Sequence, residues 1–362
     1  MATSLYEQIP QHSTSPVLHW IGMDVAKSSF DAAVVRAGQH YDAATFRDVP
    51  VHTFARTRAG VKACLAWLRS ALAEGVRPEH TRVCMEATGN YSTQLATWLL
   101  EISPGITPAI VNPHYTAAFI KSLGLRAKTD SLEARALAFY GAERQPVPYE
   151  PLSRAQAELR ELSRSRDHLV RQEVALKNHA AELTGASRDA EQTYRRLIRQ
   201  LQSSIARIEQ RILRLLTEHP KLGADVVQLQ TIDGVGPVTS VTVVAELGDL
   251  RRFTHARQLS AFVGISPSIV QSGSSVHLRP KLCKRGNPRV RKVLFMAAMA
   301  AIQKPGILKD TYDRLLAQGK EPMLALGAIM RKLLVLMRAI LINGTTYNPG
   351  LLPCSNGGID CA

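Results

Sequence analysis

Cysteine is scarce in this chain of 362 residues and is spaced irregularly. Its five cysteines, an odd number with no CxxC pair among them, are Cys64, Cys84, Cys283, Cys354 and Cys361. A disulfide framework requires an even set, and a structural zinc site requires closely spaced pairs, so neither is indicated. A reducing cytoplasmic location is therefore expected.

Long hydrophobic runs are also missing. Residues 1–16 are polar, which argues against a signal peptide and favours a disordered tail. The most apolar late stretch, residues 323–342, is interrupted by Arg331, Lys332 and Arg338. Charges inside such a stretch disfavour a membrane span, so a core helix is predicted and no membrane partner is expected.

Negative charge is in short supply. Lys and Arg number 45 against 30 Asp and Glu, which gives a formal net charge of +15. This balance favours a polyanionic partner, most commonly nucleic acid, although a merely basic protein remains an alternative.

The shortage of acids is greatest between Leu250 and Lys309, where there is no Asp or Glu. Such a stretch is expected to repel itself unless an external anion such as a nucleic-acid backbone compensates it. Its cations are Arg251, Arg252, Arg257, Arg279, Lys281, Lys284, Arg285, Arg289, Arg291, Lys292, Lys304 and Lys309.

Four carboxylates in the first 135 residues form the most informative pattern. Asp24 and Glu86 each close an apolar run that is typical of a buried strand, and Asp130 and Glu133 lie three residues apart at the start of a helical pattern. We expect the four to converge at one sheet edge and bind hard divalent cations, which clamp phosphodiester oxygens. Two alternatives are solvated strand-end acids at Asp24 and Glu86 and a capping box at Asp130 and Glu133.

The pattern of apolar residues predicts an α/β unit with a mixed sheet covered on both faces. Strands are expected at 18–25, 29–36, 42–48, 80–85 and 107–111, and helices at 55–74, 91–102, 113–122 and 130–142. The proline-rich segment 145–151 ends the unit.

The rest of the chain reads as helical. A heptad pattern over 153–218 predicts two long helices that break near residues 185–187 and form a coiled-coil hairpin, a dimer zipper, or a pair packed only within the chain. Farther on, Gly234, Gly236 and Pro237 separate two helices. They resemble a helix-hairpin-helix that faces a phosphate, or a plain packing unit.

Ser272 lies in a loop rich in glycine and serine within the basic stretch. A hydroxyl among guanidinium groups can attack a phosphate, because the cations stabilise the alkoxide. From these two residues alone, Ser272-Gly273 is typical of a turn. Ser274 and Ser275 are competing nucleophiles.

Taken together, these motifs resemble the DEDD-type insertion-sequence transposases of the "IS one-ten" family, the bridge-RNA-guided recombinases, over roughly residues 17–345. The segments 22–25, 85–89 and 128–130 are similar to the family's RuvC-like (ribonuclease-H-like) domain. The segments 232–237, 264–267, 272–273 and 284–287, with Arg291, are similar to its transposase domain.

The resemblance implies a RuvC-like metal-binding domain at 17–150, coiled-coil helices at 153–218 and a helical transposase domain with the serine loop at 221–345. Tails are expected at 1–16 and 346–362. The implied enzyme is a nucleoid-associated bacterial transposase, in which Asp24, Glu86, Asp130 and Glu133 bind Mg²⁺ and Ser272 forms a phosphoserine link to DNA. Ser272 is preferred because the family's reactive serine precedes a glycine.

The partners that the resemblance implies are DNA, a guide (bridge) RNA and further copies of the chain, as a dimer or tetramer. The nucleic-acid-binding residues expected from the basic stretch and from the family motifs are Gly234, Gly236, Arg279, Lys281, Lys284, Arg285, Asn287, Arg289, Arg291 and Lys292.

One residue departs from the family pattern. Glu133 stands where the family usually has aspartate, and its longer side chain relaxes the spacing of any bound metal. Two other functions are alternatives to a transposase. One is a metal-dependent nuclease or junction resolvase that uses water as nucleophile, and the other is a non-catalytic nucleic-acid-binding scaffold.

Overall fold

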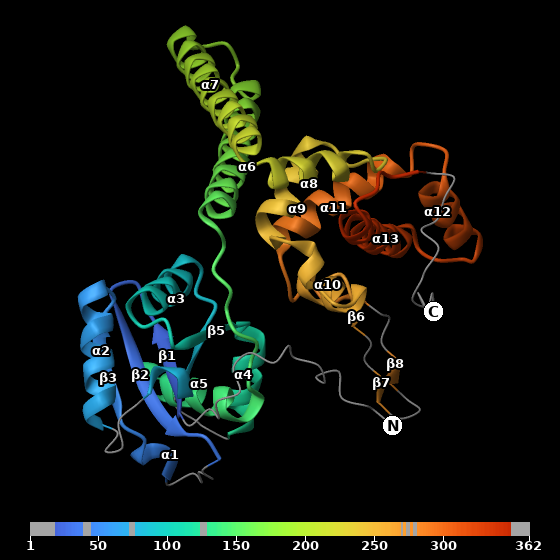
Figure 1. Cartoon of the computed structure of the whole chain (residues 1–362). Helices are drawn as coiled ribbons and strands as arrows, with labels where there is room; N and C mark the ends of the chain where they lie inside the picture. The colour runs from blue at the N-terminus through green and yellow to red at the C-terminus, as the bar shows by residue number, and fades with distance from the viewer. Residues whose placement is uncertain are drawn as a thin grey trace. The chain divides into compact units, whose positions relative to one another are not determined.

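The computed structural model describes residues 19–38, 45–71, 77–123, 129–268, 271–272, 276–277 and 281–348. For Thr45, Ala71, Ser268, Lys281 and the segments 271–272 and 276–277, it describes the backbone only. The chain forms two compact units, Met1–Pro151 and Leu152–Ala362 (Figure 1).

The first unit is built on a mixed five-stranded sheet. Its strand order is β3-β2-β1-β4-β5; the pairs β1–β2 and β2–β3 are antiparallel, and β1–β4 and β4–β5 are parallel. The predicted mixed sheet is therefore confirmed. The strands are β1 (His19–Val25), β2 (Ser29–Arg36), β3 (Val51–Ala55), β4 (Thr81–Glu86) and β5 (Thr107–Val111).

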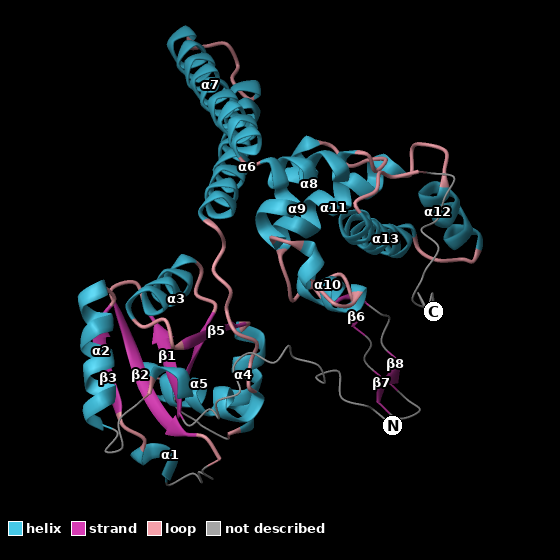
Figure 2. Cartoon of the chain, in the orientation of Figure 1, coloured by secondary structure: helices cyan, strands magenta, loops and turns pink. Residues whose placement is uncertain are grey.

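Helices cover both faces of this sheet, as predicted (Figure 2). The helices α2 (Arg58–Ala71) and α3 (Asn90–Ile102) pack on one face, and α5 (Asp130–Arg144) packs on the other. A Cβ at Gly22 would lie 2.0 Å from the Ala134 carbonyl oxygen of α5, so only glycine permits this close approach. The helix α4 (Pro113–Ser122) follows β5.

The strand predicted at 42–48 is wrong. Residues 45–48 form the short helix α1 (Thr45–Asp48), and residues 42–44 lie outside the described part. Phe46 and Val49 are both buried at a spacing of three, which one helical turn satisfies. The third strand is instead β3, which pairs with β2 at the edge of the sheet.

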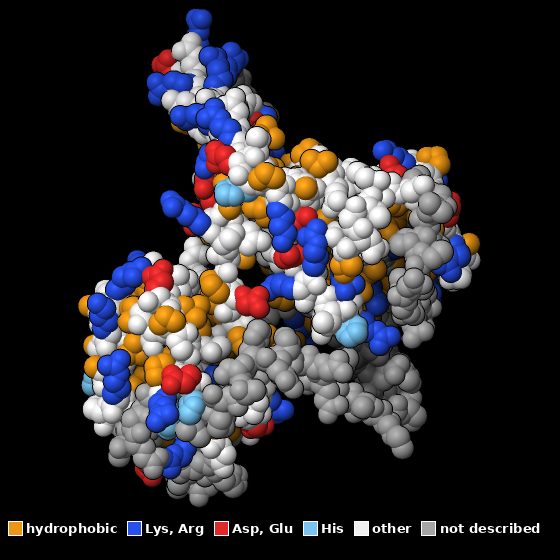
Figure 3. All heavy atoms as spheres, in the orientation of Figure 1, with side chains coloured by type: hydrophobic (Ala, Val, Ile, Leu, Met, Phe, Trp, Pro, Cys, Tyr) orange, Lys and Arg blue, Asp and Glu red, His pale blue; other side chains and the backbone are white. Residues whose placement is uncertain are grey.

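The second unit begins with a helical hairpin. Its helices α6 (Arg154–Ala181) and α7 (Arg188–Glu218) run in opposite directions. Two contacts between them show this: Arg211 pairs with Glu158, and Gln202 donates to Glu173. Gly185, with φ of +80°, lies in the turn between them. The two predicted long helices are thus confirmed, and their outer faces carry many Lys and Arg side chains (Figure 3).

A helical bundle completes the second unit around α13 (Pro322–Asn343), the apolar segment predicted to be a core helix. That prediction is confirmed, because Ile329, Leu333 and Met337 of α13 are buried. No helix in the described ranges is long and apolar enough to span a bilayer. The bundle consists of α8 (Pro220–Gln230), α9 (Pro237–Leu247), α10 (Ala256–Val263), α11 (Pro288–Ala301), α12 (Ile307–Ala317) and α13 (Pro322–Asn343).

Candidate functional site

The sheet register places Asp24 and Glu86 side by side. Met23 of β1 pairs with Met85 of the parallel strand β4, so the next residue of each strand lies at the same level. Asp24 comes two residues after Gly22, which contacts α5, and therefore points to the same face of the sheet. Glu86 follows Cys84 of the same face in the same way.

The first turn of α5 brings Asp130 and Glu133 to this face. Ala134, Leu137 and Ala138 of α5 pack on the sheet. Asp130 precedes Ala134 by four residues, and Glu133 precedes Leu137 by four, so both acids continue the stripe of α5 that faces the sheet.

The electrostatics of Asp24 show that the predicted acids are neighbours. Burial and the nearby carboxylates of Glu133, Asp130, Asp31 and Glu86 raise its pKa from 3.8 to about 6. The structure therefore brings all four predicted acids together at the end of β1.

Two polar neighbours of this site were missed in the sequence. Asp31 of β2 lies directly opposite Asp24 and accepts a hydrogen bond of 2.7 Å from Thr53. The buried Thr116 of α4 donates a hydrogen bond of 2.9 Å to Glu86 Oε2. The short β1–β2 connection was a usable signal for Asp31, since it fixes the register that pairs residues 24 and 31.

The donor chemistry of this group fits a divalent cation. Carboxylate oxygens are the ligands that Mg²⁺ prefers, and a bound cation would offset both the burial and the neighbouring negative charges that raise the pKa of Asp24. Among the described residues, no three His, Cys, Asp or Glu side chains stand close enough to enclose a metal ion as they are. The group is thus a set of neighbouring acids rather than a closed coordination shell.

The capping-box interpretation of Asp130 and Glu133 is wrong. The N-cap of α5 is Thr129, whose hydroxyl accepts a hydrogen bond of 3.4 Å from the Leu132 backbone amide. Asp130 is already the first helical residue, so Glu133 falls one position beyond the place of a capping-box acid.

Ser272 lies in a β-hairpin segment of the second unit, which we call the serine hairpin (residues 267–282). Its outer strands β6 (Pro267–Ser268) and β9 (Lys281–Leu282) pair, as do its inner strands β7 (Gln271–Ser272) and β8 (Val276–His277). Ser272 is therefore in a strand opposite Val276, rather than within a turn. Gly273, Ser274, Ser275 and Arg279 lie outside the described residues.

Two glycines allow close backbone contacts at the base of the serine hairpin. A Cβ at Gly264 would lie 2.7 Å from the Gly286 amide nitrogen, and a Cβ at Gly286 would lie 2.2 Å from the Phe262 carbonyl oxygen. Lys284 donates its backbone amide to Gly264, and Arg291 donates to the Val263 carbonyl at 3.0 Å. The segment 284–287 therefore anchors the hairpin on α10.

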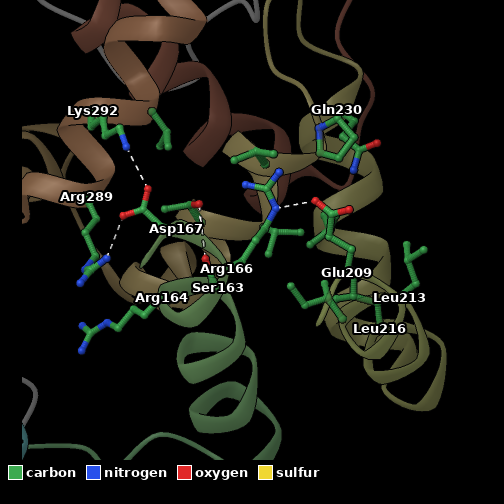
Figure 4. A pocket seen from close by; sticks show the side chains of 17 residues that line it. Ser163, Arg164, Arg166, Asp167, Glu209, Leu213, Leu216, Gln230, Arg289 and Lys292 are labelled. Carbon is green, nitrogen blue, oxygen red and sulfur yellow. Dashed lines mark hydrogen bonds and ion pairs between the residues drawn. The ribbon is translucent and has the colours of Figure 1, made fainter. Parts of the chain in front are cut away.

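The expectation that only an external anion compensates the basic stretch is wrong for part of it, because other segments supply acids to several of its cations. Asp167 of α6 binds Lys292 at 2.9 Å and Arg289 at 3.2 Å (Figure 4). Arg251 forms a bidentate pair with Asp225, and Lys304 binds Asp233. Arg289 and Lys292, both predicted to bind nucleic acid, thus share one carboxylate within the unit, and both line a cavity of about 470 Å³.

Asn287 joins the hairpin anchor to a buried acid that the sequence did not reveal. Its Oδ1 caps α11, and its Nδ2 donates to Glu246 at 2.9 Å. Arg164 of α6 forms a bidentate pair with Glu246 at 2.6 and 2.8 Å. Burial by itself would raise the pKa of Glu246, but the hydrogen bonds from Arg164 and Asn287 outweigh burial and lower it.

The two glycines between α8 and α9 occupy different environments. A Cβ at Gly234 (φ +82°) would lie 2.4 Å from the Ala297 carbonyl oxygen, so this glycine allows α11 to pack closely. The site of a Cβ at Gly236 is open. Gly236 is the N-cap of α9 and is the better placed of the two to approach a phosphate.

Comparison with known proteins identifies the family. A DEDD-type model described as "Transposase" matches residues 21–183, and a model described as "Transposase IS116/IS110/IS902 family" matches residues 227–313. The pilin gene-inverting proteins of Moraxella bovis and Moraxella lacunata are each 30% identical over 323 residues, which cover 89% of this chain and 95% of theirs. The transposase of insertion sequence element IS1111A from Coxiella burnetii is 28% identical over 247 residues, covering 61% of this chain and 66% of its own.

The first match implies a RuvC-like fold for the α/β unit. The expectation of an enzyme that acts on DNA is confirmed. The chain belongs to the IS110 ("IS one-ten") family of transposases.

Proposed function

We propose that this transposase cuts and rejoins DNA through a covalent phosphoserine at Ser272, assisted by Mg²⁺ at the acids of the first unit. The observation that carries the proposal is the convergence of four carboxylates at the end of β1, two from neighbouring parallel strands and two from the first turn of α5. Asp24, Glu86, Asp130 and Glu133 would hold the cation. Bound there, Mg²⁺ supplies Lewis-acid stabilisation of charge on a phosphodiester.

The serine step is a balanced transesterification. The Ser272 oxygen bonds to phosphorus, the bond from phosphorus to one DNA oxygen breaks, and the proton of the serine hydroxyl ends on the released DNA hydroxyl. A second DNA hydroxyl reverses these changes on a new strand, so the phosphodiester energy is conserved. The name of the Moraxella relatives, gene-inverting proteins, fits an enzyme that both cuts and rejoins.

Recognition of sequence is assigned to a guide RNA. Among the predicted nucleic-acid contacts, Arg289 and Lys292 share the Asp167 carboxylate, and the Asn287 amide donates to Glu246. Side chains held in this way are less free to form bidentate contacts with base edges, which leaves base reading to RNA pairing, as in the recombinases that the motifs resemble.

Assembly and domain roles complete the proposal. The first unit carries the acids, the α6–α7 hairpin acts as a coiled-coil element between copies, and the helical bundle carries the serine hairpin and a helix-hairpin-helix at Gly236. In a dimer or tetramer, Ser272 of one copy completes the acid group of another.

The test is a trapped adduct. The full-length protein is incubated with RNA from the element end, Mg²⁺ and labelled matched DNA, and the mixture is denatured. Wild type should yield labelled protein, Ser272→Ala should yield none, and Asp24→Ala should abolish all cleavage.

The alternative is a metal-dependent nuclease or junction resolvase that uses water. It is favoured if Ser272→Ala cleaves DNA at the wild-type rate. Cleavage that survives Asp24→Ala would remove the acid group from the mechanism and contradict both proposals.

A further inference from the structure

A preorganised cation lies at the same sheet edge as the acid group. Arg56 follows β3, and its backbone amide donates to the Ser28 carbonyl at 2.8 Å. Ser28 belongs to the connection between β1, which ends just after Asp24, and β2. Arg56 and Asp24 therefore occupy the edge of the sheet where β1 ends.

The guanidinium of Arg56 is fixed by three neighbours. Its Nε donates to the Lys27 carbonyl at 2.9 Å, and one terminal nitrogen donates to the Gln94 side chain. Its carbon Cζ lies 4.4 Å from the centre of the Tyr91 ring. Ordering a free arginine costs about 2 kcal/mol of side-chain entropy, a cost that this arrangement has already met.

The fixed guanidinium still has hydrogen-bonding capacity. Five N–H groups are present on an arginine side chain, and Arg56 uses two of them, so three remain. No carboxylate in the described ranges pairs with Arg56 or with the exposed Lys27. By contrast, the nearby Arg58 is paired with Glu101, and Arg289 and Lys292 are paired with Asp167.

The local surface is open to a long ligand. Tyr91 is exposed, and the position of a Cβ at Gly89, between Glu86 and Tyr91, has nothing within 4 Å. An unpaired planar cation with free N–H groups, set beside an exposed lysine, matches the charge and geometry of a phosphate.

We infer that Arg56 and Lys27 form a phosphate-binding site for the DNA strand that enters the acid group. Arg56 is the fixed forked donor, and the exposed Lys27 supplies a second positive charge to the phosphates of the same DNA strand. The inference rests on the proposed function, since it assumes that the acids engage a phosphodiester. It adds a DNA contact in the first unit, whereas all the predicted contacts lie in the second.

The test is DNA binding by the full-length protein without divalent metal, so that no cleavage occurs. Affinity for a fluorescent DNA duplex is measured between low and high salt for wild type, Lys27→Ala, Arg56→Gln and the control Arg69→Ala. Arg69 is an exposed cation in the last turn of α2. Lys27→Ala removes an exposed side chain and should fold normally even if Arg56→Gln loosens the β1–β2 connection.

Each of the two site variants should reduce affinity several-fold. Each should also make the negative slope of log K against log salt shallower by about 0.9, the value of one lost phosphate contact. Arg69→Ala should retain the wild-type slope. Unchanged slopes for both Lys27→Ala and Arg56→Gln overturn the inference, as does an equal loss in Arg69→Ala. An effect seen with RNA of the same length but not with DNA overturns the assignment to DNA.

Comparing metal-free binding with a separate cleavage assay in Mg²⁺ distinguishes this inference from the proposed chemistry. Asp24→Asn should bind at least as tightly as wild type, because it removes a negative charge near the strand. If Asp24→Asn retained strand cleavage while Lys27→Ala made the slope shallower, the phosphate site would stand and the proposed chemistry would fall.

Discussion

The hydroxyl of Thr116 donates a hydrogen bond of 2.9 Å to Glu86 Oε2. Thr116 is only 1% exposed, so this donor is fixed on α4 beside the acid at the end of β4. The contact orients one carboxylate oxygen and leaves the other available for a cation.

Thr116→Val should therefore reduce metal affinity more than it reduces the stability of the fold. Loss of one hydrogen bond costs about 1 kcal/mol of stability, whereas loss of an orienting partner typically costs about 10–100-fold in metal affinity. Calorimetric titration with Mn²⁺ and thermal melting measure the two effects. Thr116→Ser retains the hydroxyl and should behave as wild type; equal metal affinity in the valine variant would contradict a positioning role.

Asp24→Asn should make the metal-free protein more stable at neutral pH. The folded-state pKa of Asp24 is raised from 3.8 to about 6, so the folded protein holds this proton more tightly than the unfolded chain does. The contribution of Asp24 to stability therefore falls as pH rises from about 4 to 6, and the carboxylate opposes folding above that range.

Melting curves of wild type and Asp24→Asn between pH 5 and 8, recorded in a chelator, measure this effect. The variant should melt about 2–4 °C higher at pH 7.5, with the difference shrinking toward pH 5. DNA cleavage by the variant should be lost. A lower melting temperature at pH 7.5 would show that the acids do not repel one another.

Glu133→Gln should abolish cleavage without reducing stability. Thr129 caps α5, so Glu133 is not needed to begin the helix. Thr129→Ala is the matched control and should lose about 1 kcal/mol of stability while retaining activity. Urea unfolding and the cleavage assay are compared for both variants. A destabilised but active Glu133→Gln would reverse the assignment.

Glu246→Gln should destabilise the second unit strongly. The Glu246 side chain is 1% exposed and balances Arg164, so its neutralisation leaves a cation without its partner at a cost of about 3 kcal/mol. Glu209→Gln breaks the more exposed pair with Arg166 and should cost less than about 1 kcal/mol.

The pH dependence of Glu246 has the opposite sign to that of Asp24. Its folded-state pKa is lowered, so its contribution is present above the unfolded pKa of 4.5 and is lost as pH falls below it. Urea unfolding at pH 7 and at pH 4 should show the gap between wild type and Glu246→Gln narrowing at the lower pH. A constant gap would indicate that Glu246 acts by packing rather than by charge.

Much of the first unit could be predicted from the order of residues alone. Its strands at 19–25, 29–36, 81–86 and 107–111 have apolar patterns that local physics imposes, and their carboxyl ends place Asp24 and Glu86 at one edge. The strand at 51–55 escaped prediction because an edge strand buries few side chains, and of its residues only Phe54 is buried.

The sequence by itself determined the family, the four acids and the long helices, because motifs and apolar periodicity are properties of neighbouring residues. Only the tertiary structure decided which charges are available for a ligand. Asp167 and Asp225 form ion pairs with cations more than 20 residues away in the chain, and Asp31 lies opposite Asp24 through a strand register. Arg56, which follows a strand missed in the sequence, has no such partner among the described residues. Charge acts through space, so pairing across the fold leaves no local pattern in the sequence.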